Sequence, residues 1–564
     1  MSTPRCPRRR QLLGARRGLV VAMATGLALL AAVPSSATAT PLAPATARDG
    51  EARLLGRIEF PATGAPEAHQ LFLEGVLYLH NFEYDEAAAS FAAARELDPA
   101  FVLAYWGEAM THNHPIWMQQ DRDAALEVLA ALAPTAEERL AKAATPRERA
   151  WLRAVETLYG NTPESSGKSK QERDLLYRDE MERLHEAFPE DQEAAAFHAL
   201  SILGTAHQGR DFATYMRAAA VAEGVWTAND QHPGAAHYLI HSYDDPVHAP
   251  LGLPMARAYS RIAPAAAHAQ HMTSHIFVAL GLWTDVATAN EVATDVENAS
   301  RAEQGRREGV CGHYPFWLEY GYLQLGRLGD AASVLDRCHR RVGDEPSDGE
   351  VWHFNVMRAR YAIDAEDWST HERWPATAER SDASSHFTDA YSAIRRGELA
   401  AARTHLADVV VPDDDAGRSG AEDAVAILRQ EIEGLLAIAE GNVEAGLETL
   451  RAASAREGEL PYAFGPPEIV KPAAELLGEE LARAGRHQDA AAAFRAQLER
   501  TPRRTTSLLG LARVLEQLGD ERTARDAWSE LVEIWRAADA DLPALEEARG
   551  KAASGSAASA SALP

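Results

Sequence analysis

The chain of 564 residues carries 83 acidic and 56 basic side chains, a formal net charge of −27. This acidic balance argues against nucleic acid and anionic membrane surfaces as partners. The length exceeds one compact core, yet the composition changes little along the chain and marks no boundary between domains of different classes.

The amino terminus has the pattern of an export signal. Residues 8–13 read Arg-Arg-Arg-Gln-Leu-Leu, residues 18–33 are apolar, and residues 37–39 are small. This order predicts a cleaved signal peptide over residues 1–39. The paired arginines resemble a twin-arginine signal, the bacterial route for folded proteins, although ordinary secretory signals also carry arginines. We therefore expect a periplasmic or extracellular protein.

A membrane anchor is the competing interpretation, but the apolar stretch is short for a span.

Cleavage after residue 39 would leave 50 basic and 83 acidic residues, a formal net charge of −33, and only two cysteines, Cys311 and Cys338. Two cysteines rule out a cysteine-built metal cluster and leave one disulfide open. We expect cations to be drawn toward such a chain.

Residues 40–64 are predicted to be a flexible linker, and a helical repeat begins after them. Counting from Ala68 as position one, small residues fall at positions 8, 20 and 27, as Gly75, Ala87 and Ala94, with Phe91 at position 24. Small residues at these positions let two helices and the next repeat approach closely. Weaker copies follow, including one that starts at Gly312.

This pattern resembles the tetratricopeptide-repeat (TPR) family over most of residues 65–540. The resemblance implies an all-α, TPR-type α-solenoid of antiparallel helix pairs, a fold often used for protein–protein interaction. We expect a superhelix with a His-rich groove over 65–410, an acidic loop over 411–422, further TPR repeats over 423–546, and a disordered Ala/Ser-rich tail over 547–564.

Histidines repeat with the period of this fold. His207, His241 and His275 lie 34 residues apart, and His237 and His271 repeat the same step. Two histidines four positions apart project from one face of a helix within chelating distance, as in His237/His241 and His271/His275. Nine of the 21 histidines lie between residues 198 and 275. The sequence therefore nominates this stretch as a site.

In the TPR family, positions 2, 5, 9 and 12 of the first helix line the concave groove. With repeats starting at Ala199, Pro233 and Ala267, the candidate metal ligands occupy such positions: His207, His237, His241, His268, His271 and His275. Asp244, His112 and His114 are supplementary candidates. Imidazole-rich ligation without sulfur suits copper, zinc or iron, at one ion or two close ions.

Two functions remain open from the sequence. The first is an exported metalloprotein, an oxidoreductase or a metal-handling protein. The second is a non-catalytic TPR scaffold whose His-lined groove binds a peptide or an envelope protein. Simple packing of duplicated histidines is a third interpretation. No phosphate-binding loop, nucleophile elbow or zinc-protease motif is present, so whether the protein is an enzyme stays undecided.

Residues 232–246 and 262–277 also resemble a signature of a group of exported bacterial TPR proteins. The resemblance supports the architecture and marks this stretch as distinctive, but it implies no reaction.

Overall fold

The computed structural model describes residues 54–375, 381–411 and 420–560, most of them in helices. The amino-terminal elements are α2 (Pro66–His80), α3 (Tyr84–Leu97), α4 (Val102–Met110), β1 (Asn113–His114), the 3-10 turn η1 (Pro115–Trp117), β2 (Gln119–Gln120), α5 (Arg122–Leu132), α6 (Ala136–Lys142), α7 (Pro146–Leu158) and α8 (Lys170–Ala187). The two short strands pair antiparallel, with Asn113 opposite Gln120.

The central helices are α9 (Gln192–Leu203), α10 (Phe212–Ala228), α11 (Pro233–Tyr243), α12 (Ala249–Ile262), α13 (Ala267–Ala279), α14 (Trp283–Glu303), α15 (His313–Gln324), α16 (Leu328–Val342), α17 (Asp348–Asp364) and α18 (Thr370–Arg373). The carboxy-terminal elements are α19 (Ala383–Arg395), α20 (Leu399–Asp408), α21 (Gly420–Ala439), α22 (Val443–Glu459), α23 (Ala473–Arg483), α24 (His487–Arg500), α25 (Thr505–Gln517), α26 (Glu521–Ile534), η2 (Trp535–Ala537) and α27 (Pro543–Ala560).

Small residues let the paired helices approach closely, as the repeat pattern predicts. Phe91 of α3 lies between Gly75 of α2 and Gly107 of α4, where an added Cβ would come within 2.8 and 2.3 Å of its ring. Far along the chain, Phe494 of α24 lies in the same way between Gly478 and Gly510, at 2.9 and 2.3 Å. Side chains larger than hydrogen at these glycines would push the helices apart, because packed interiors leave no free volume.

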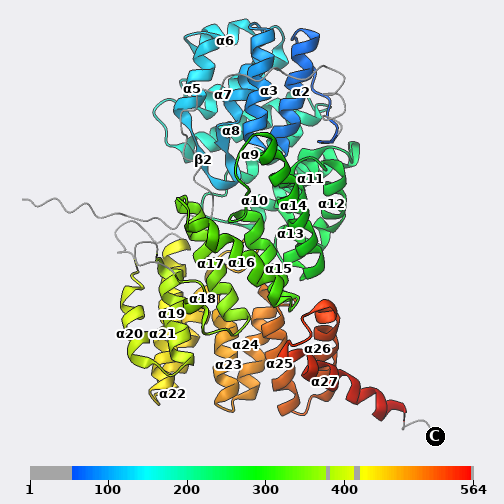
Figure 1. The fold of residues 1–564 in the computed structure, drawn as a ribbon. Coiled ribbons are helices and arrows are strands. Elements are labelled where there is room, and N and C mark those ends of the chain that lie inside the picture. The colour runs from blue at the N-terminus through cyan, green and yellow to red at the C-terminus, as the bar shows by residue number, and fades with distance from the viewer. Residues whose placement is uncertain (1–53, 376–380, 412–419, 561–564) are drawn as a thin grey trace, which may run out of the picture.

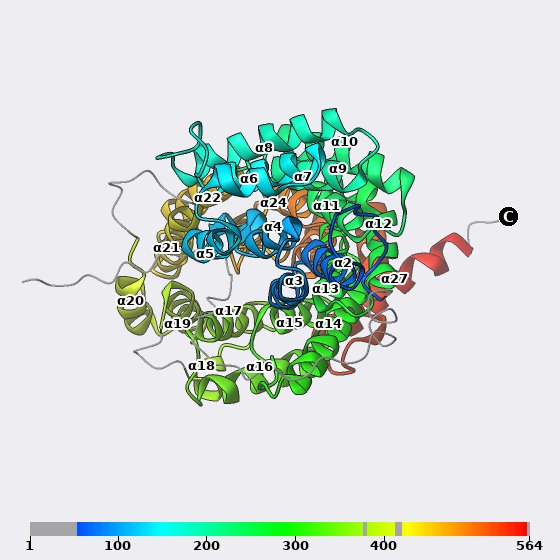
Figure 2. The same ribbon diagram turned by 90° about the horizontal axis from the view of Figure 1, so that it is seen from above.

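The helix pairs wind around a common axis. The chain descends from α2 to α8 through the central helices to the carboxy-terminal ones (Figure 1), and from above the helices surround this axis (Figure 2). Consecutive helices make most of the contacts, as expected for a solenoid. The prediction of an all-α solenoid of antiparallel helix pairs is confirmed.

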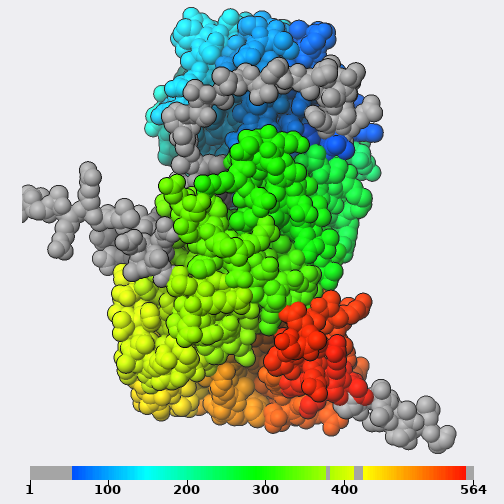
Figure 3. Space-filling view, viewed as in Figure 1, coloured from blue at the N-terminus to red at the C-terminus, as the bar shows by residue number. Residues whose placement is uncertain are grey.

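The carboxy-terminal helices also pack directly against the central ones (Figure 3). The buried guanidinium of Arg504 pairs with Glu475 and with Asp364 of α17. The indole of Trp283 donates to the carbonyl oxygen of Arg503 at 2.9 Å. These contacts join segments distant in sequence, so the central and carboxy-terminal helices form one packed body.

Residues 460–472, which connect α22 to α23 without a helix, cross to the central repeats. Gly465 lies so close to Trp317 that an added Cβ would come within 2.1 Å of the indole. The ring of Tyr462 stacks on Phe212 with centroids 6.0 Å apart. This connection helps to cover Trp317, which is 1% exposed.

The helices and the core extend into three segments that were predicted to be a linker, a loop and a disordered tail. The predicted linker 40–64 already contributes Leu55 and Phe60 to the core, because apolar side chains in this stretch find a buried surface. The predicted loop 411–422 ends earlier, since α21 starts at Gly420, and the predicted tail 547–564 is helical to Ala560 within α27. Alanine is the strongest helix former, which explains the helical tail.

The predicted signal peptide 1–39, together with residues 40–53, 412–419 and 561–564, lies outside the described residues. Cleavage and export therefore stay predictions. Among the described helices, none combines the length and apolar character that a membrane span requires.

Cys311 and Cys338 form a disulfide, with Cα atoms 4.4 Å apart. The bond ties the segment just before α15 to α16. It therefore fixes the start of α15, where His313 is the first residue.

Candidate functional site

Three alternate helices, α11, α13 and α15, carry the histidines of the site. His232 caps α11, since its Nδ1 accepts a hydrogen bond from the amide of Ala235 at 3.1 Å, and Pro233 fits the first turn. Every residue of α11 and of α13 is buried. Their histidines therefore lie within the molecule rather than along an open groove.

The first group, named trio A here, consists of His237 and His241 of α11 and His268 of α13. One ring nitrogen of each lies within 4.8 Å of the others. The three residues are 0%, 3% and 9% exposed. Phe82 closes one side, with its ring centroid 4.2 Å from that of His237. Trio A is thus a buried cluster of imidazoles next to the ring of Phe82.

The second group, trio B, consists of His271 and His275 of α13 and His313 of α15. The Nε2 atom of His271 lies 3.2 Å from Nε2 of His275 and 2.9 Å from Nε2 of His313. Two nitrogens bound to one tetrahedral ion at 2.0–2.1 Å would lie about 3.3 Å apart. The indole of Trp317 covers the trio, with centroids 4.4 Å from His275, and His313 alone is exposed.

Hydrogen bonds determine the tautomers of His271 and His275. Nδ1 of His275 lies 2.6 Å from the carboxylate of Asp244, which only accepts, so this nitrogen carries the proton. Nδ1 of His271 lies 2.7 Å from Oδ1 of Asn290, whose amide nitrogen donates to the carbonyl of Val286 and so fixes the orientation of the amide. His271 therefore also donates through Nδ1. With Nδ1 as the protonated nitrogen of each ring, the Nε2 atoms of His271 and His275 hold lone pairs that face each other.

Trio A has a similar arrangement with fewer partners. Nδ1 of His237 donates to the backbone carbonyl of His80 at 2.7 Å. Within the described part of the chain, Nε2 of His237, both ring nitrogens of His241 and Nε2 of His268 are buried without a hydrogen-bond partner. Native proteins rarely leave buried polar groups unpaired unless an ion or a water completes the site.

Burial keeps these imidazoles neutral. It lowers the pKa of His237 to about 3, with repulsion from His275 and His80 adding to the effect. Burial, followed by repulsion from neighbouring imidazoles, also lowers the pKa of His241, His268 and His271 well below 6.5. A proton shared between the rings is therefore disfavoured at neutral pH, and the free lone pairs remain available to a cation.

A third buried cluster, His80, Glu193 and His232, behaves differently. Nε2 of His80 donates to Glu193 at 2.7 Å, and its Nδ1 accepts from the hydroxyl of Tyr238 at 2.8 Å. Nε2 of His232 lies 3.3 Å from the other carboxylate oxygen, and its Nδ1 caps α11. Although burial raises the pKa of Glu193, the two histidines lower it to about 2. Three of the four ring nitrogens here make hydrogen bonds to protein atoms. The fourth, Nε2 of His232, makes no hydrogen bond but lies at ion-pair distance from Glu193, so it faces a carboxylate and not another imidazole.

The structure brings five of the six predicted ligands together: His237, His241, His268, His271 and His275. His207 is not among them, because α9 ends at Leu203 and the repeat register assumed from Ala199 is wrong there. Its Nε2 instead lies 3.1 Å from a carboxylate oxygen of Asp174.

The supplementary candidates also lie outside the two trios. Asp244 holds His275 through Nδ1 rather than facing the Nε2 side. His114 stacks on Tyr84 with centroids 3.9 Å apart, and half-buried His112 precedes β1.

Sequence reasoning missed His313 and Asn290. His313 lies 42 residues after His271 rather than 34, because the 21-residue helix α14 and the segment after it lengthen the connection. A usable signal was present, since a repeat starting at Gly312 places His313 at position 2, the position of His268 in its own repeat.

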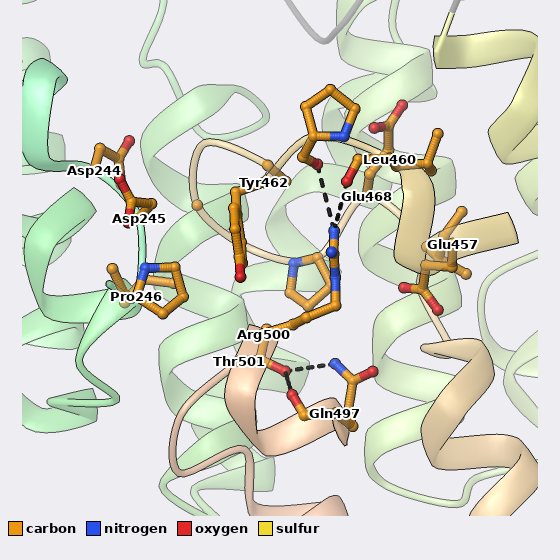
Figure 4. A pocket seen from close by; sticks show the side chains of 17 residues that line it. Asp244, Asp245, Pro246, Glu457, Leu460, Tyr462, Glu468, Gln497, Arg500 and Thr501 are labelled. Carbon is orange, nitrogen blue, oxygen red and sulfur yellow. Dashed lines mark hydrogen bonds between the residues drawn. The ribbon is translucent and has the colours of Figure 1, made fainter. Parts of the chain in front are cut away.

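A small cavity of about 50 Å³ lies behind His275, on the side of Asp244. Asp244 and Asp245 bound one wall, and Tyr462, Gln497 and Arg500 lie opposite (Figure 4). The guanidinium of Arg500 donates to the carbonyl of Leu460 at 3.1 Å. The cavity adjoins the carboxylate that orients His275 and not its Nε2 atom.

No model of a known protein family matches the chain, and neither does any curated protein. Solved structures with some similarity include the human IFIT1 dimer with m7Gppp-AAAA (TM-score 0.30, 14% identity, covering 87% of this chain and 95% of that one). Yeast Tom70 (0.27, 11%, 87% and 96%) and the TPR domain of P58(IPK) (0.22, 12%, 81% and 99%) are two others. Such low TM-scores carry no argument about this chain, whose fold rests on its own helices and their packing.

Proposed function

We propose that this protein is an exported metalloprotein that binds a transition-metal ion at trio B. One observation carries the proposal: the Nε2 atoms of His271, His275 and His313 converge at 2.9 and 3.2 Å, although hydrogen bonds leave lone pairs on the first two. Two lone pairs at this separation repel unless a cation lies between them. Burial disfavours a proton there, so a metal ion is the better candidate.

The surroundings of the trio support the same proposal. Histidines that bind metals usually donate their other ring N–H to a carboxylate or carbonyl oxygen, as His275 does to Asp244 and His271 does to Asn290. Three imidazoles without sulfur suit copper, zinc or iron, with one position open to water or a substrate. The identity of the ion would distinguish an oxidoreductase from a metal-handling protein. Export through a twin-arginine route would let the protein fold around its ion before export.

The scaffold alternative remains a second candidate for the TPR-like fold. Its partner would bind elsewhere than at the predicted His-lined groove, because His237, His241, His268, His271 and His275 are all buried. Residues 460–472 further cover the side of Trp317.

Elemental analysis of the mature, untagged protein after dialysis tests the proposal. We expect copper, zinc or iron at one or more atoms per chain. His313→Asn should lose the ion of trio B, and His207→Asn, a histidine outside the trios, should keep it. Less than about a tenth of an atom per chain in the wild type, with no uptake of added Cu(II) or Zn(II), would contradict metal binding and favour the scaffold.

A further inference from the structure

Trios A and B are built in the same way. Each begins with two histidines four residues apart on one helix: His237 and His241 on α11, and His271 and His275 on α13, exactly one repeat of 34 residues later. The first turn of the next helix of the series completes each trio. His268 is the second residue of α13, and His313 is the first residue of α15.

The six imidazoles do not form one coordination shell. Their ligand atoms divide into two groups, each compact within 4.8 Å. The two groups are nevertheless neighbours, since the ring centroids of His241 and His275 are 5.8 Å apart and those of His268 and His271 are 6.1 Å apart. The arrangement provides two places for an ion side by side.

Trio A needs a ligand for reasons of its own. Four of its ring nitrogens are buried without a hydrogen-bond partner among the described residues, although leaving buried polar groups unpaired destabilises a fold. The carbonyl of His80 accepts from Nδ1 of His237 and aims Nε2 of that ring into the trio. Packing alone would not favour such a cluster, because apolar side chains of the same size would fill the space without this cost.

We infer that trio A binds a second transition-metal ion next to the ion of trio B, so that the protein holds a pair of ions with three imidazole ligands each. This inference rests on the proposed function for trio B and adds a site to it. The two positions differ chemically. Trio A is enclosed and oriented by a backbone carbonyl, whereas trio B is held by Asp244 and Asn290 and reaches the surface at His313.

The test is a metal titration of the mature, metal-stripped protein with Cu(II), followed by desalting and elemental analysis. We expect two ions per chain. His268→Asn and His313→Asn are a matched pair, because each removes the histidine that a first helical turn contributes. Each should retain one ion, and the double variant should retain none. His207→Asn is the control and should retain two.

One ion per chain in the wild type, lost in His313→Asn and kept in His268→Asn, would overturn this inference while the proposed function stands. No ion in the wild type would overturn both. Electron paramagnetic resonance of the loaded wild type needs no variant: two neighbouring Cu(II) ions should show dipolar splitting and a half-field transition. Two full, isolated spins would contradict the adjacent pair.

Discussion

Two histidine clusters of this protein differ in the groups that their ring nitrogens face. In the cluster of His80, Glu193 and His232, each ring nitrogen faces a protein partner of the complementary kind. In trio B, the lone pairs on Nε2 of His271 and Nε2 of His275 face each other at 3.2 Å. The first cluster contains its own opposite charge, the carboxylate of Glu193, whereas under the proposed function the second would receive one from a bound cation. The presence of several histidines therefore does not distinguish the two clusters. The group that each ring nitrogen faces does distinguish them.

The largest expected effect is the loss of stability when the cluster of His80, Glu193 and His232 loses its carboxylate. Glu193→Ala removes the acceptor shared by two buried histidines and should destabilise the metal-free protein by about 3–5 kcal/mol, as for other buried pairs that lose one partner. Urea unfolding measures this loss, with the exposed Glu190→Ala as control. A loss below about 1 kcal/mol would show that the cluster does not hold the fold.

The second-largest expected effect is the stabilisation of the folded protein by metal binding at trio B. Adding metal at one hundred times its Kd should stabilise the protein by about 2.7 kcal/mol per site, because the ion binds the folded chain. Calorimetry with and without chelator measures the increment. The increment from trio B should vanish in His313→Asn, and the full increment should persist in Glu193→Ala if that variant folds. An equal increment in wild type and His313→Asn would place the ion elsewhere.

The third prediction concerns Asp244→Asn, which changes the group that orients His275 and leaves the three imidazoles of trio B in place. It replaces the carboxylate that holds Nδ1 of His275, and such changes usually reduce metal affinity about 10- to 100-fold. Competition with a chelator measures the affinity. Asp174→Asn, which alters the partner of His207, should leave it unchanged. Unchanged affinity in Asp244→Asn would show that the charge of Asp244 does not support a ligand at trio B.

The smallest expected effect comes from the disulfide. Cys311 lies two residues before His313, so the bond to Cys338 restrains the start of α15. Replacing both cysteines by serine should weaken metal binding at trio B by less than Asp244→Asn does, and should leave trio A unchanged. Chelator competition on His268→Asn, which isolates trio B, and on His313→Asn, which isolates trio A, compares the two. A loss at both trios would mean a general loosening of the fold.

The spacing of histidines along the sequence was sufficient to predict part of the candidate metal site. The spacing of His237 from His241, and of His271 from His275, predicts two pairs because a helix repeats every 3.6 residues. His268 follows from its place at the start of the next repeat. His207 shows the limit: its 34-residue spacing is correct, yet the helix ends before it and the side chain pairs with Asp174.

The sequence by itself determined the helices, the glycines that let them pack, and the two histidine pairs, because these depend on contacts within a few residues or on a regular repeat. Only the tertiary structure decided that His313 completes trio B, that Asn290 and the carbonyl of His80 fix the tautomers, and that His80 and His232 both face Glu193. The physical reason is that the chemistry of an imidazole depends on what each ring nitrogen faces. That depends on side chains brought together by helix packing from distant parts of the chain.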